Sequence, residues 1–254
     1  MHKEASDFTA MILQNGDCLE LMKDIPNGSV DMILCDLPYG TTGCNWDKVL
    51  PLDKLWAEYN RVLRYDGAAV LFSAQPFTTH LIYSNKKAFR YCWYWLKNTP
   101  TGFTFARYQP MRKVEEICVF YRKHGTYNPQ GLQKIIGGKV RRKKPKEGEI
   151  VYRQHTLVKP YTPKYENHPK NVLQFATERG YHPTQKPVPL LEYLIRTYTN
   201  DGDTILDNCM GSGSTGVAVK RVGDRHFIGI EMDEGYYNIA CKRIEEAVKC
   251  EPTT

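Results

Sequence analysis

A short motif, Asp36–Gly40, directly follows a run of apolar residues and combines groups that could activate an aromatic amine. The amino nitrogen of a nucleobase is a poor nucleophile because its lone pair is delocalised into the ring. The Asp36 carboxylate and the Leu37 carbonyl oxygen could accept its two N–H hydrogens and free that lone pair. Pro38 restrains Leu37 to an extended conformation, and Tyr39 offers a ring on which an extruded base could stack. The motif therefore predicts chemistry on an amino nitrogen.

A second motif, the glycine-rich turn Asp207–Gly216, lies between a predicted strand and a predicted helix. Its glycines Gly211, Gly213 and Gly216 have the spacing GxGxxG, which allows a tight turn and close approach of a nucleotide to the backbone. Glu231 stands 15 residues after Gly216, at the end of the next predicted strand. A carboxylate there can accept hydrogen bonds from ribose hydroxyls.

Two nucleotide-containing ligands fit such a turn. A dinucleotide needs a second mononucleotide-binding half, and only 23 residues follow Glu231. Asp207 precedes the turn, where a carboxylate is unfavourable beside a pyrophosphate and favourable beside a cation. S-adenosylmethionine carries a sulfonium and an ammonium group as well as an adenosine ribose, so these residues favour it. A tight turn without a ligand is the remaining alternative.

Basic residues outnumber acidic ones, with 35 Lys and Arg against 28 Asp and Glu, for a net charge of +7. This balance is a mild indication of a polyanionic partner. The segment from Lys134 to Lys146 has seven basic residues and no acidic ones, which suits contacts with phosphates. A solvated run of charges without a specific role is the alternative. The basic residues of the segment are Lys134, Lys139, Arg141, Arg142, Lys143, Lys144 and Lys146. Side chains suited to base edges precede it, namely Lys97, Asn98, Arg107, Gln109 and Arg112.

The periodicity of apolar residues predicts an α/β protein with a Rossmann-like, doubly wound and mostly parallel sheet. Strands are predicted at 30–36, 68–73, 90–97, 115–123, 204–207 and 226–233, and helices at 18–25, 51–67, 75–88, 188–199, 217–223 and 234–248. Asp66 and Gly67 are expected to end the helix at 51–67. The rhythm is lost in the middle of the chain. We therefore expect an N-terminal half at 1–98, an inserted recognition region at 99–180 and a C-terminal half at 181–254.

Composition and cysteine spacing exclude several other classes of protein. No apolar run approaches the roughly 18 residues that a membrane helix needs, and the N-terminus lacks the apolar stretch of a secretory signal. We therefore expect a cytoplasmic protein with no membrane partner. The eight cysteines form no CxxC pair and have no zinc-like spacing with histidine, so we expect reduced thiols and no metal site.

Three motifs in a fixed order resemble the S-adenosylmethionine-dependent amino-methyltransferases of DNA. They are Asp36–Tyr39, His182–Pro187 (HPTQKP) and Asp207–Thr215 (DNCMGSGST). The catalytic motif comes first, then a variable insertion, then HPTQKP and the cofactor turn, which is the circularly permuted order of the family's beta group. The resemblance covers nearly the whole chain except about 126–179. It implies that a base is flipped out of duplex DNA and methylated by direct transfer to adenine N6 or cytosine N4.

The resemblance also implies roles for individual residues. Asp36 and the Leu37 carbonyl would accept the target amine, with Pro38 and Tyr39 completing the catalytic motif. Cofactor contacts are implied for Asp17, Cys18, Asp36, Thr184, Lys186, Asp207, Asn208, Gly211, Ser212, Gly213, Ser214, Thr215, Glu231 and Met232. Among these, Thr184 and Lys186 resemble ligands of the methionine carboxylate, and Glu231 resembles the ribose acceptor. The family usually has Pro where Leu37 stands, and often Pro-Phe where Asn208-Cys209 stands.

Duplex DNA is the partner that the resemblance implies. DNA contacts are predicted for Lys97, Arg107, Arg112, Lys139, Arg141, Arg142, Lys143 and Lys144. The sequence leaves open whether a second copy of the chain or a restriction endonuclease is a further partner.

The target base and the class of acceptor leave alternatives. Asp36, rather than Ser, at the first motif position favours adenine, with cytosine N4 as the alternative. Methylation of the cytosine ring carbon is disfavoured because it usually needs a Cys after a Pro, and none of the 15 prolines precedes Cys. A catalytically inactive DNA-binding relative, and an RNA or protein amino-methyltransferase, are further alternatives.

Overall fold

The computed structural model describes residues 10–40, 48–136, 162–178, 180–181 and 184–249. The chain divides into two compact units. The larger comprises Met1–Asn128 and Asn171–Thr254, and the smaller comprises Pro129–Lys170. In the described part of the smaller unit, β6 (Gln133–Lys134) pairs with β7 (Tyr165–Glu166) in an antiparallel ladder.

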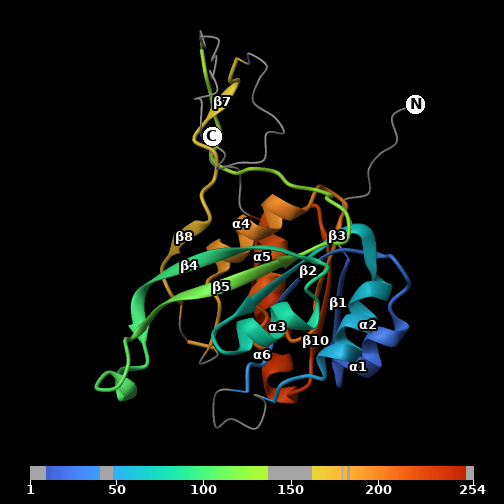
Figure 1. Cartoon of the computed structure of the whole chain (residues 1–254). Helices are drawn as coiled ribbons and strands as arrows, with labels where there is room; N and C mark the ends of the chain where they lie inside the picture. The colour runs from blue at the N-terminus through green and yellow to red at the C-terminus, as the bar shows by residue number, and fades with distance from the viewer. Residues whose placement is uncertain (1–9, 41–47, 137–161, 179, 182–183, 250–254) are drawn as a thin grey trace, which may run out of the picture. The chain divides into compact units, whose positions relative to one another are not determined.

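An eight-stranded sheet forms the centre of the larger unit in its described residues (Figure 1), with the order β1-β10-β9-β2-β3-β5-β4-β8. The first five strands in this order pair in parallel, β5 is antiparallel to both of its neighbours, and β8 is parallel to β4. The strands are β1 (Met11–Asn15), β2 (Val30–Asp36), β3 (Leu63–Ser73), β4 (Phe89–Thr101), β5 (Arg112–Phe120), β8 (Val172–Phe175), β9 (Thr204–Asp207) and β10 (His226–Glu231).

Helices cover both faces of this sheet (Figure 1). One face carries α1 (Cys18–Leu21) with the 3₁₀ turn η1 (Met22–Asp24), α2 (Leu52–Val62) and α3 (Phe77–Ser84), and the other carries α4 (Val188–Tyr198), α5 (Ser214–Val222) and α6 (Glu234–Glu246). In β2, Met32 and Leu34 pack in the core with α4–α6, whereas Ile33 and Cys35 pack in the core with α1–α3. Covering on both faces explains why β2 is apolar along its length. The predicted Rossmann-like α/β fold is confirmed.

None of the helices in the described residues has both the length and the apolar character needed to span a bilayer.

The predicted end of the helix at 51–67 is wrong. α2 ends at Val62, and the chain is already extended at Leu63, which pairs with Val30 of β2. Gly67 therefore lies inside β3 and does not terminate a helix. A Cβ at Gly67 would lie 2.7 Å from the Asp31 carbonyl oxygen, so close packing against the neighbouring strand accounts for this glycine.

β5 lies inside the stretch 99–180, which the sequence predicts as an insertion. It nevertheless belongs to the main sheet, where it pairs with β3 and β4. β5 begins at Arg112 and ends at Phe120, whereas the sequence predicts a strand at 115–123. On β4, Trp93 and Trp95 are buried in the core, in keeping with their position on one face of the strand. The compact unit apart from the sheet is the shorter stretch 129–170.

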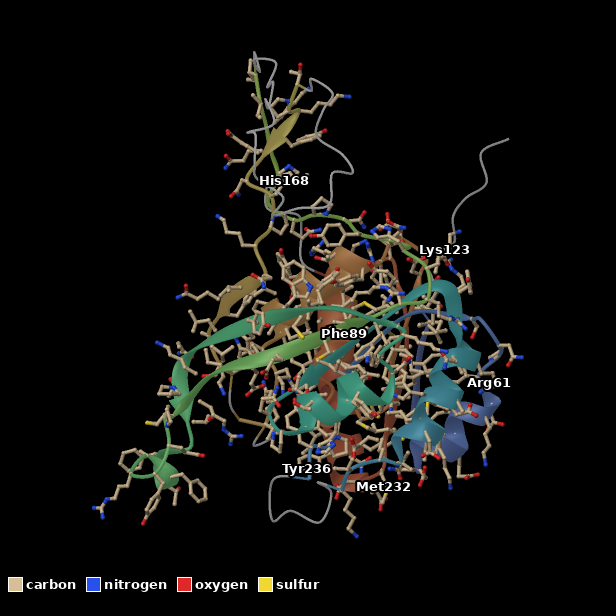
Figure 2. The ribbon with its side chains drawn as sticks, in the orientation of Figure 1. Arg61, Phe89, Lys123, His168, Met232 and Tyr236 are labelled. Carbon is tan, nitrogen blue, oxygen red and sulfur yellow. The ribbon has the colours of Figure 1, made fainter. Side chains whose placement is uncertain are left out.

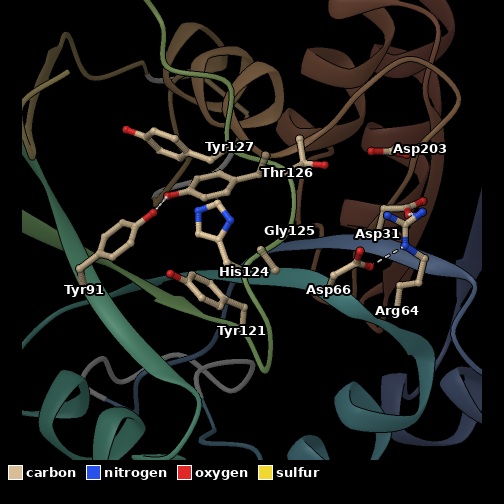
Figure 3. Close-up of a pocket in the computed structure, with 12 residues that line it drawn as sticks. Asp31, Arg64, Asp66, Tyr91, Tyr121, His124, Gly125, Thr126, Tyr127 and Asp203 are labelled. Atoms are coloured by element: carbon tan, nitrogen blue, oxygen red, sulfur yellow. Dashed lines mark hydrogen bonds and ion pairs between the residues drawn. The ribbon is translucent and has the colours of Figure 1, made fainter. Parts of the chain in front are cut away.

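Aromatic side chains pack around the segment that leaves β5 (Figure 3). The Tyr198 hydroxyl accepts a hydrogen bond from Trp93 Nε1 at 2.6 Å and shares another with the Tyr91 hydroxyl at 2.9 Å. The rings of Tyr127 and Tyr198 lie 6.2 Å apart. The pocket among these residues has a volume of about 10 Å³, which is room for about one water molecule. We therefore assign this cluster to packing.

Gly125, in the same segment (Figure 3), passes too close to β3 to carry a side chain. A Cβ at this position would lie 1.9 Å from the Asp66 carbonyl oxygen. We expect Gly125→Ala to displace this backbone and to lower the free energy of unfolding by about 1–3 kcal/mol, the usual cost of overpacking. Chemical denaturation measures the change.

Gly235→Ala in α6 is the matched control for this substitution. Its Cβ would meet only the Asp233 carboxylate within 4 Å, at 3.1 Å. Because alanine favours the helical state over glycine, we expect this variant to be at least as stable as the wild type. Equal stability of the Gly125 and Gly235 variants would contradict the packing argument.

Candidate active site

The carboxyl ends of β2 and β9 meet where the strand order of the sheet reverses. From β2 the sheet continues to β3, whereas from β9 it continues in the opposite direction to β10 and β1. Open α/β sheets bind ligands at such a point. A cavity of about 790 Å³ opens here, lined by the loops after β1, β2, β9 and β10 and by parts of β4 and β5. It brings together the Asp36 motif, the glycine-rich turn and residues 184–186.

The Asp36 carboxylate is held from two sides. Its Oδ1 accepts a hydrogen bond from the Tyr39 hydroxyl at 2.6 Å, and its Oδ2 accepts one from Lys186 Nζ. The Tyr39 ring stacks on Phe77, with ring centroids 5.3 Å apart. Burial and the nearby Asp36 charge raise the pKa of Tyr39 well above its ordinary value, so its hydroxyl remains a donor. The carboxylate is thus oriented while 25% of the Asp36 side-chain surface stays exposed.

Leu37 and Pro38 continue the cavity wall after Asp36. The Leu37 side chain is buried in the core with α1–α3. This burial anchors the backbone at the position where the resembling family usually has Pro.

Four charged side chains, one of them Asp36 itself, form a network beside the Asp36 motif. Lys186 Nζ pairs with Asp36 and lies 3.8 Å from Glu115 Oε2, and Glu115 Oε1 accepts a hydrogen bond from Lys97 Nζ at 2.8 Å. Burial lowers the pKa of Lys186, but the Asp36 and Glu115 carboxylates outweigh it and raise this pKa overall. Burial raises the pKa of Glu115, but the two lysines outweigh it and lower this pKa overall. The lysine and glutamate at the centre of the network therefore stay ionised.

Lys186, which the resemblance assigns to a cofactor carboxylate, lines the cavity. Its Nζ contacts the Asp36 carboxylate and lies 3.4 Å from the Thr184 carbonyl oxygen. Thr184 itself lines the cavity. The HPTQKP motif thus supports the Asp36 carboxylate directly through its lysine.

The glycine-rich turn is tied to the end of β10. Gly211 and Gly213 have φ angles of 53° and 79°, in the left-handed region that favours glycine. The Gly211 N–H donates to Glu231 Oε2 at 2.8 Å, and the Asp233 N–H donates to Glu231 Oε1 at 2.9 Å. A Cβ on Gly213 would lie 2.8 Å from the Ala240 Cβ of α6. Glu231 is therefore fixed at the cavity wall, with lone pairs remaining for a further donor.

Asp207 is a buried acid at the floor of the cavity. It is 3% exposed and accepts a hydrogen bond from the Cys209 N–H at 3.2 Å. Burial raises its pKa to about 7. Among the described residues it forms no ion pair. A buried acid of this kind suits a cationic ligand.

Asn208, where the resembling family often has Pro, is fixed by a side chain from α2. Its Oδ1 accepts a hydrogen bond from the Tyr59 hydroxyl at 2.5 Å, and its amide nitrogen lies 3.6 Å from Cys18 Sγ and 3.4 Å from Cys209 Sγ. Both Asn208 and Cys18 are buried and line the cavity. Side-chain hydrogen bonding therefore restrains this loop in place of a proline ring.

The other residues implied as cofactor ligands lie on the same cavity. Asp17 caps α1, because its Oδ1 accepts a hydrogen bond from the Leu19 N–H at 2.7 Å. Arg243 of α6 donates to the Ser212 carbonyl oxygen at 2.5 Å and hydroxyl at 2.9 Å. Met232 is 75% exposed, at the same end of the unit as Tyr236 (Figure 2). Ser214 and Thr215 complete the lining.

The residues predicted to contact DNA differ in how exposed they are. Lys97 is 3% exposed and paired with Glu115, so it lies in the cavity wall and not on the surface. Arg112 is exposed and also lines the cavity, and Arg107 is exposed between β4 and β5. The remaining predicted contacts lie outside the described residues: Lys139, Arg141, Arg142, Lys143 and Lys144.

Two acidic residues of the site are absent from the sequence predictions. Glu115 links Lys97 to Lys186, and Glu178 Oε2 accepts hydrogen bonds from the Val188 N–H at 3.2 Å and from Gln185 Nε2 at 3.4 Å. Because β5 runs antiparallel to β3, its first residues lie at the edge where the parallel strands end. An acidic residue at the start of an apolar strand could have pointed to Glu115 as a site residue. Placing it in the site, however, also required knowing that β5 runs antiparallel to β3.

Comparisons with known proteins identify a family and a fold for this chain. A family model described as DNA methylase matches residues 30–242. The chain is 29% identical to the DNA adenine methyltransferase YhdJ of Escherichia coli (strain K12), over 94% of this chain and 84% of that one. The structure of an M1.HpyAVI-SAM complex is similar at a TM-score of 0.63 and 27% identity, covering 92% of this chain and 99% of that chain. The cytosine-N4-specific PvuII DNA methyltransferase, at a TM-score of 0.67 and 16% identity over 92% of this chain and 87% of that chain, shares the fold.

We expect Asp207 to make the stability of the protein depend on pH. Its pKa is raised from 3.8 to about 7 in the folded state. The stability that protonated Asp207 contributes is therefore complete below the unfolded value and is lost as the pH rises through about 7. Asp207→Asn should remove this loss, so that the variant gains stability over the wild type with rising pH, by at most on the order of 4 kcal/mol.

Chemical denaturation of both proteins at a series of pH values measures this difference. Asp53→Asn, at an exposed position in α2, is the control and should follow the wild type. If the wild type and the Asp207 variant show parallel pH curves, the buried carboxyl does not titrate as described.

Proposed function

We propose that this chain, which belongs to the DNA methylase family, transfers a methyl group from S-adenosylmethionine to the exocyclic amino group of adenine in duplex DNA. The observation that carries the proposal is the shared cavity. The oriented Asp36 carboxylate and the turn held by Glu231 line the same space, so an amine and a methyl donor can meet there.

The residues around the glycine-rich turn fit S-adenosylmethionine, which supplies a methyl group on a positively charged sulfur when bound. Glu231 can accept hydrogen bonds from ribose hydroxyls, and Gly211, which lines the cavity, lets the ligand approach the backbone, while Gly213 makes room for α6. Asp207 is a buried acid whose ionised form a cation stabilises. The similar structure of an M1.HpyAVI-SAM complex supports the same choice of cofactor.

Asp36 and the Leu37 carbonyl are the proposed acceptors for the two N–H hydrogens of the target amine. Accepting both draws the nitrogen toward tetrahedral geometry, and its lone pair can then attack the methyl carbon as the bond to sulfur breaks. The methylated nitrogen must lose one proton, which Asp36 is placed to accept. Direct transfer requires alignment of nitrogen, methyl and sulfur, and a fixed carboxylate provides part of it.

Tyr39 and Lys186 prepare this carboxylate before the base arrives. Each donates a hydrogen bond to one oxygen of Asp36, which fixes the plane of the group. Phe77 covers one face of the Tyr39 ring, and we place the flipped base against the other face. Aromatic stacking would then hold the base while its amino group contacts Asp36.

Adenine is the preferred target for two reasons. Asp36 at the first motif position resembles the adenine-directed members of the family, and the relative YhdJ is named as a DNA adenine methyltransferase. The fold alone does not choose the base, because the cytosine-N4-specific PvuII enzyme shares it. The chemical identity of the methylated base, measured by mass spectrometry of digested DNA, separates adenine N6 from cytosine N4.

Loss of the Asp36 carboxylate should abolish catalysis without removing the cofactor. We expect Asp36→Ala to reduce methyl transfer by about a hundredfold or more, since the amine loses its charged acceptor. Binding of S-adenosylmethionine should persist, because the turn with Gly211 and Glu231 is untouched. Tritium incorporation into mixed-sequence plasmid DNA measures transfer, and calorimetry measures binding.

The control for this experiment is Asp53→Ala in the exposed part of α2. It removes a carboxylate outside the cavity and should leave both measurements unchanged. Retained turnover in the Asp36 variant would contradict the proposed mechanism.

The basic segment that contains Lys143 and Lys144 is the proposed grip on DNA phosphates. We expect the double change of these residues to alanine to weaken binding to any DNA sequence. The slope of log K against log [salt] should become less steep by about 2, because each phosphate contact contributes about 0.9. Fluorescence anisotropy with labelled duplexes at several salt concentrations measures the slope. Lys86→Ala with Lys87→Ala, an exposed pair after α3, is the control. An unchanged slope in the Lys143 and Lys144 variant would remove these lysines from the contacts.

A further inference from the structure

The loop that joins β4 to β5, here called the hairpin tip (Gly102–Met111), exposes three aromatic side chains. Phe103 is 81% exposed, Phe105 is 58% exposed and Tyr108 is 86% exposed. Single exposed apolar residues are common on protein surfaces, but a group of aromatic rings within one short loop indicates an interaction site.

The hairpin tip is held by its own backbone hydrogen bonds. Phe103–Phe105 form the 3₁₀ turn η2, which begins after Gly102 at a φ of 90°. The N–H groups of Phe105, Tyr108 and Gln109 donate to carbonyl oxygens of the same loop at 3.0, 2.9 and 3.1 Å. The aromatic rings are therefore carried by an ordered turn. Because the loop backbone is already ordered, binding would cost little backbone entropy.

The charge of this region suits a polyanion. Arg107 lies in the hairpin tip and Arg112 and Lys113 follow it, while no acidic residue occurs between Thr101 and Val114. Interleaved basic and aromatic side chains are the combination that contacts phosphates and stacks on bases. A second copy of this chain is a poorer occupant, because each copy has a net charge of +7.

The base of the same hairpin forms part of the cavity. Thr99 and Thr101 of β4, with Arg112 and Val114 of β5, line it. From there the two strands lead outward to η2, away from the helices of the larger unit (Figure 1). The exposed rings are thus attached to the wall of the cavity in which Asp36 lies.

We propose that the hairpin tip enters duplex DNA next to the target base and fills the gap that the flipped base leaves. This inference rests on the proposed function. A base that leaves the stack costs unstacking and unpairing energy, and apolar side chains inserted between bases can offset that cost. Phe103, Phe105 and Tyr108 supply the stacking surface, and Arg107 and Arg112 contact the adjacent phosphates.

The test compares two DNA substrates that differ in the cost of flipping. The sequence that the wild type methylates is first identified by methylation-sensitive sequencing of treated plasmid DNA. Two duplexes with that sequence are then made, one with the target base paired normally and one with it opposite an abasic site. The variant carries Phe103→Ala, Phe105→Ala and Tyr108→Ala in the full chain, and initial methylation rates are measured on both duplexes.

We expect the triple variant to lose roughly tenfold or more of the rate on the paired duplex, given the usual contribution of base–aromatic stacking. The loss should be much smaller opposite the abasic site, where flipping is easier. Replacing Phe103 and Phe105 by Trp should retain activity on both duplexes, because the stacking surface is kept. Tyr83→Ala, which removes an 80% exposed ring from α3, is the matched control and should match the wild type.

Three results would overturn the inference. An equal loss on both duplexes would assign the aromatic residues a role other than filling the gap, and unchanged rates would assign them none. A dimer in light scattering that becomes a monomer in the triple variant would make the tip an interface between copies. A wild type that methylates no DNA would instead overturn the proposed function, which distinguishes the two failures.

Discussion

The ion pair between the partly exposed Asp36 and the buried Lys186 is the interaction on which the rest of the site depends. It joins two residues 150 positions apart in the sequence, one at the end of β2 and one just before α4. Two charges leave water to form it, and such a cost is offset only when further partners are present. Tyr39 supplies one on the carboxylate side, and Glu115 supplies the counter-charge on the lysine side. The result is a carboxylate of fixed direction whose remaining surface faces the cavity.

The sheet topology explains why motifs far apart in the sequence meet at this point. β2 and β9 are neighbours at the reversal of strand order, so the loops that follow them share one cavity. Asp36 ends the first strand and Asp207 ends the second. Their environments differ, since Asp36 stays partly exposed with a lysine beside it, while Asp207 is buried, forms no ion pair with another described residue and has a raised pKa. One acid thus suits an amine and the other a cationic ligand.

Local motifs predicted much of the fold and part of the site. The apolar run before Asp36 and the glycines after Asp207 carry their own structural information, because buried strands and tight turns depend on short stretches of sequence. Contacts between strands could not be predicted from short stretches of sequence, because they depend on which strands pair and in which direction. Lys97, predicted to contact DNA, is buried against Glu115 because β4 and β5 pair in antiparallel register. Gly67, predicted to end a helix, lies inside β3, where the neighbouring strand β2 leaves no room for a Cβ. This contact also depends on which strands pair.

The most direct test of the central claim is sequencing with methylation detection on DNA from cells that express this protein and lack adenine methylation of their own. We predict N6-methyladenine within one short sequence motif and no modification at the same sites in cells without the protein. Unmodified DNA would contradict the claim that the Asp36 cavity methylates DNA, and N4-methylcytosine alone would contradict the choice of adenine.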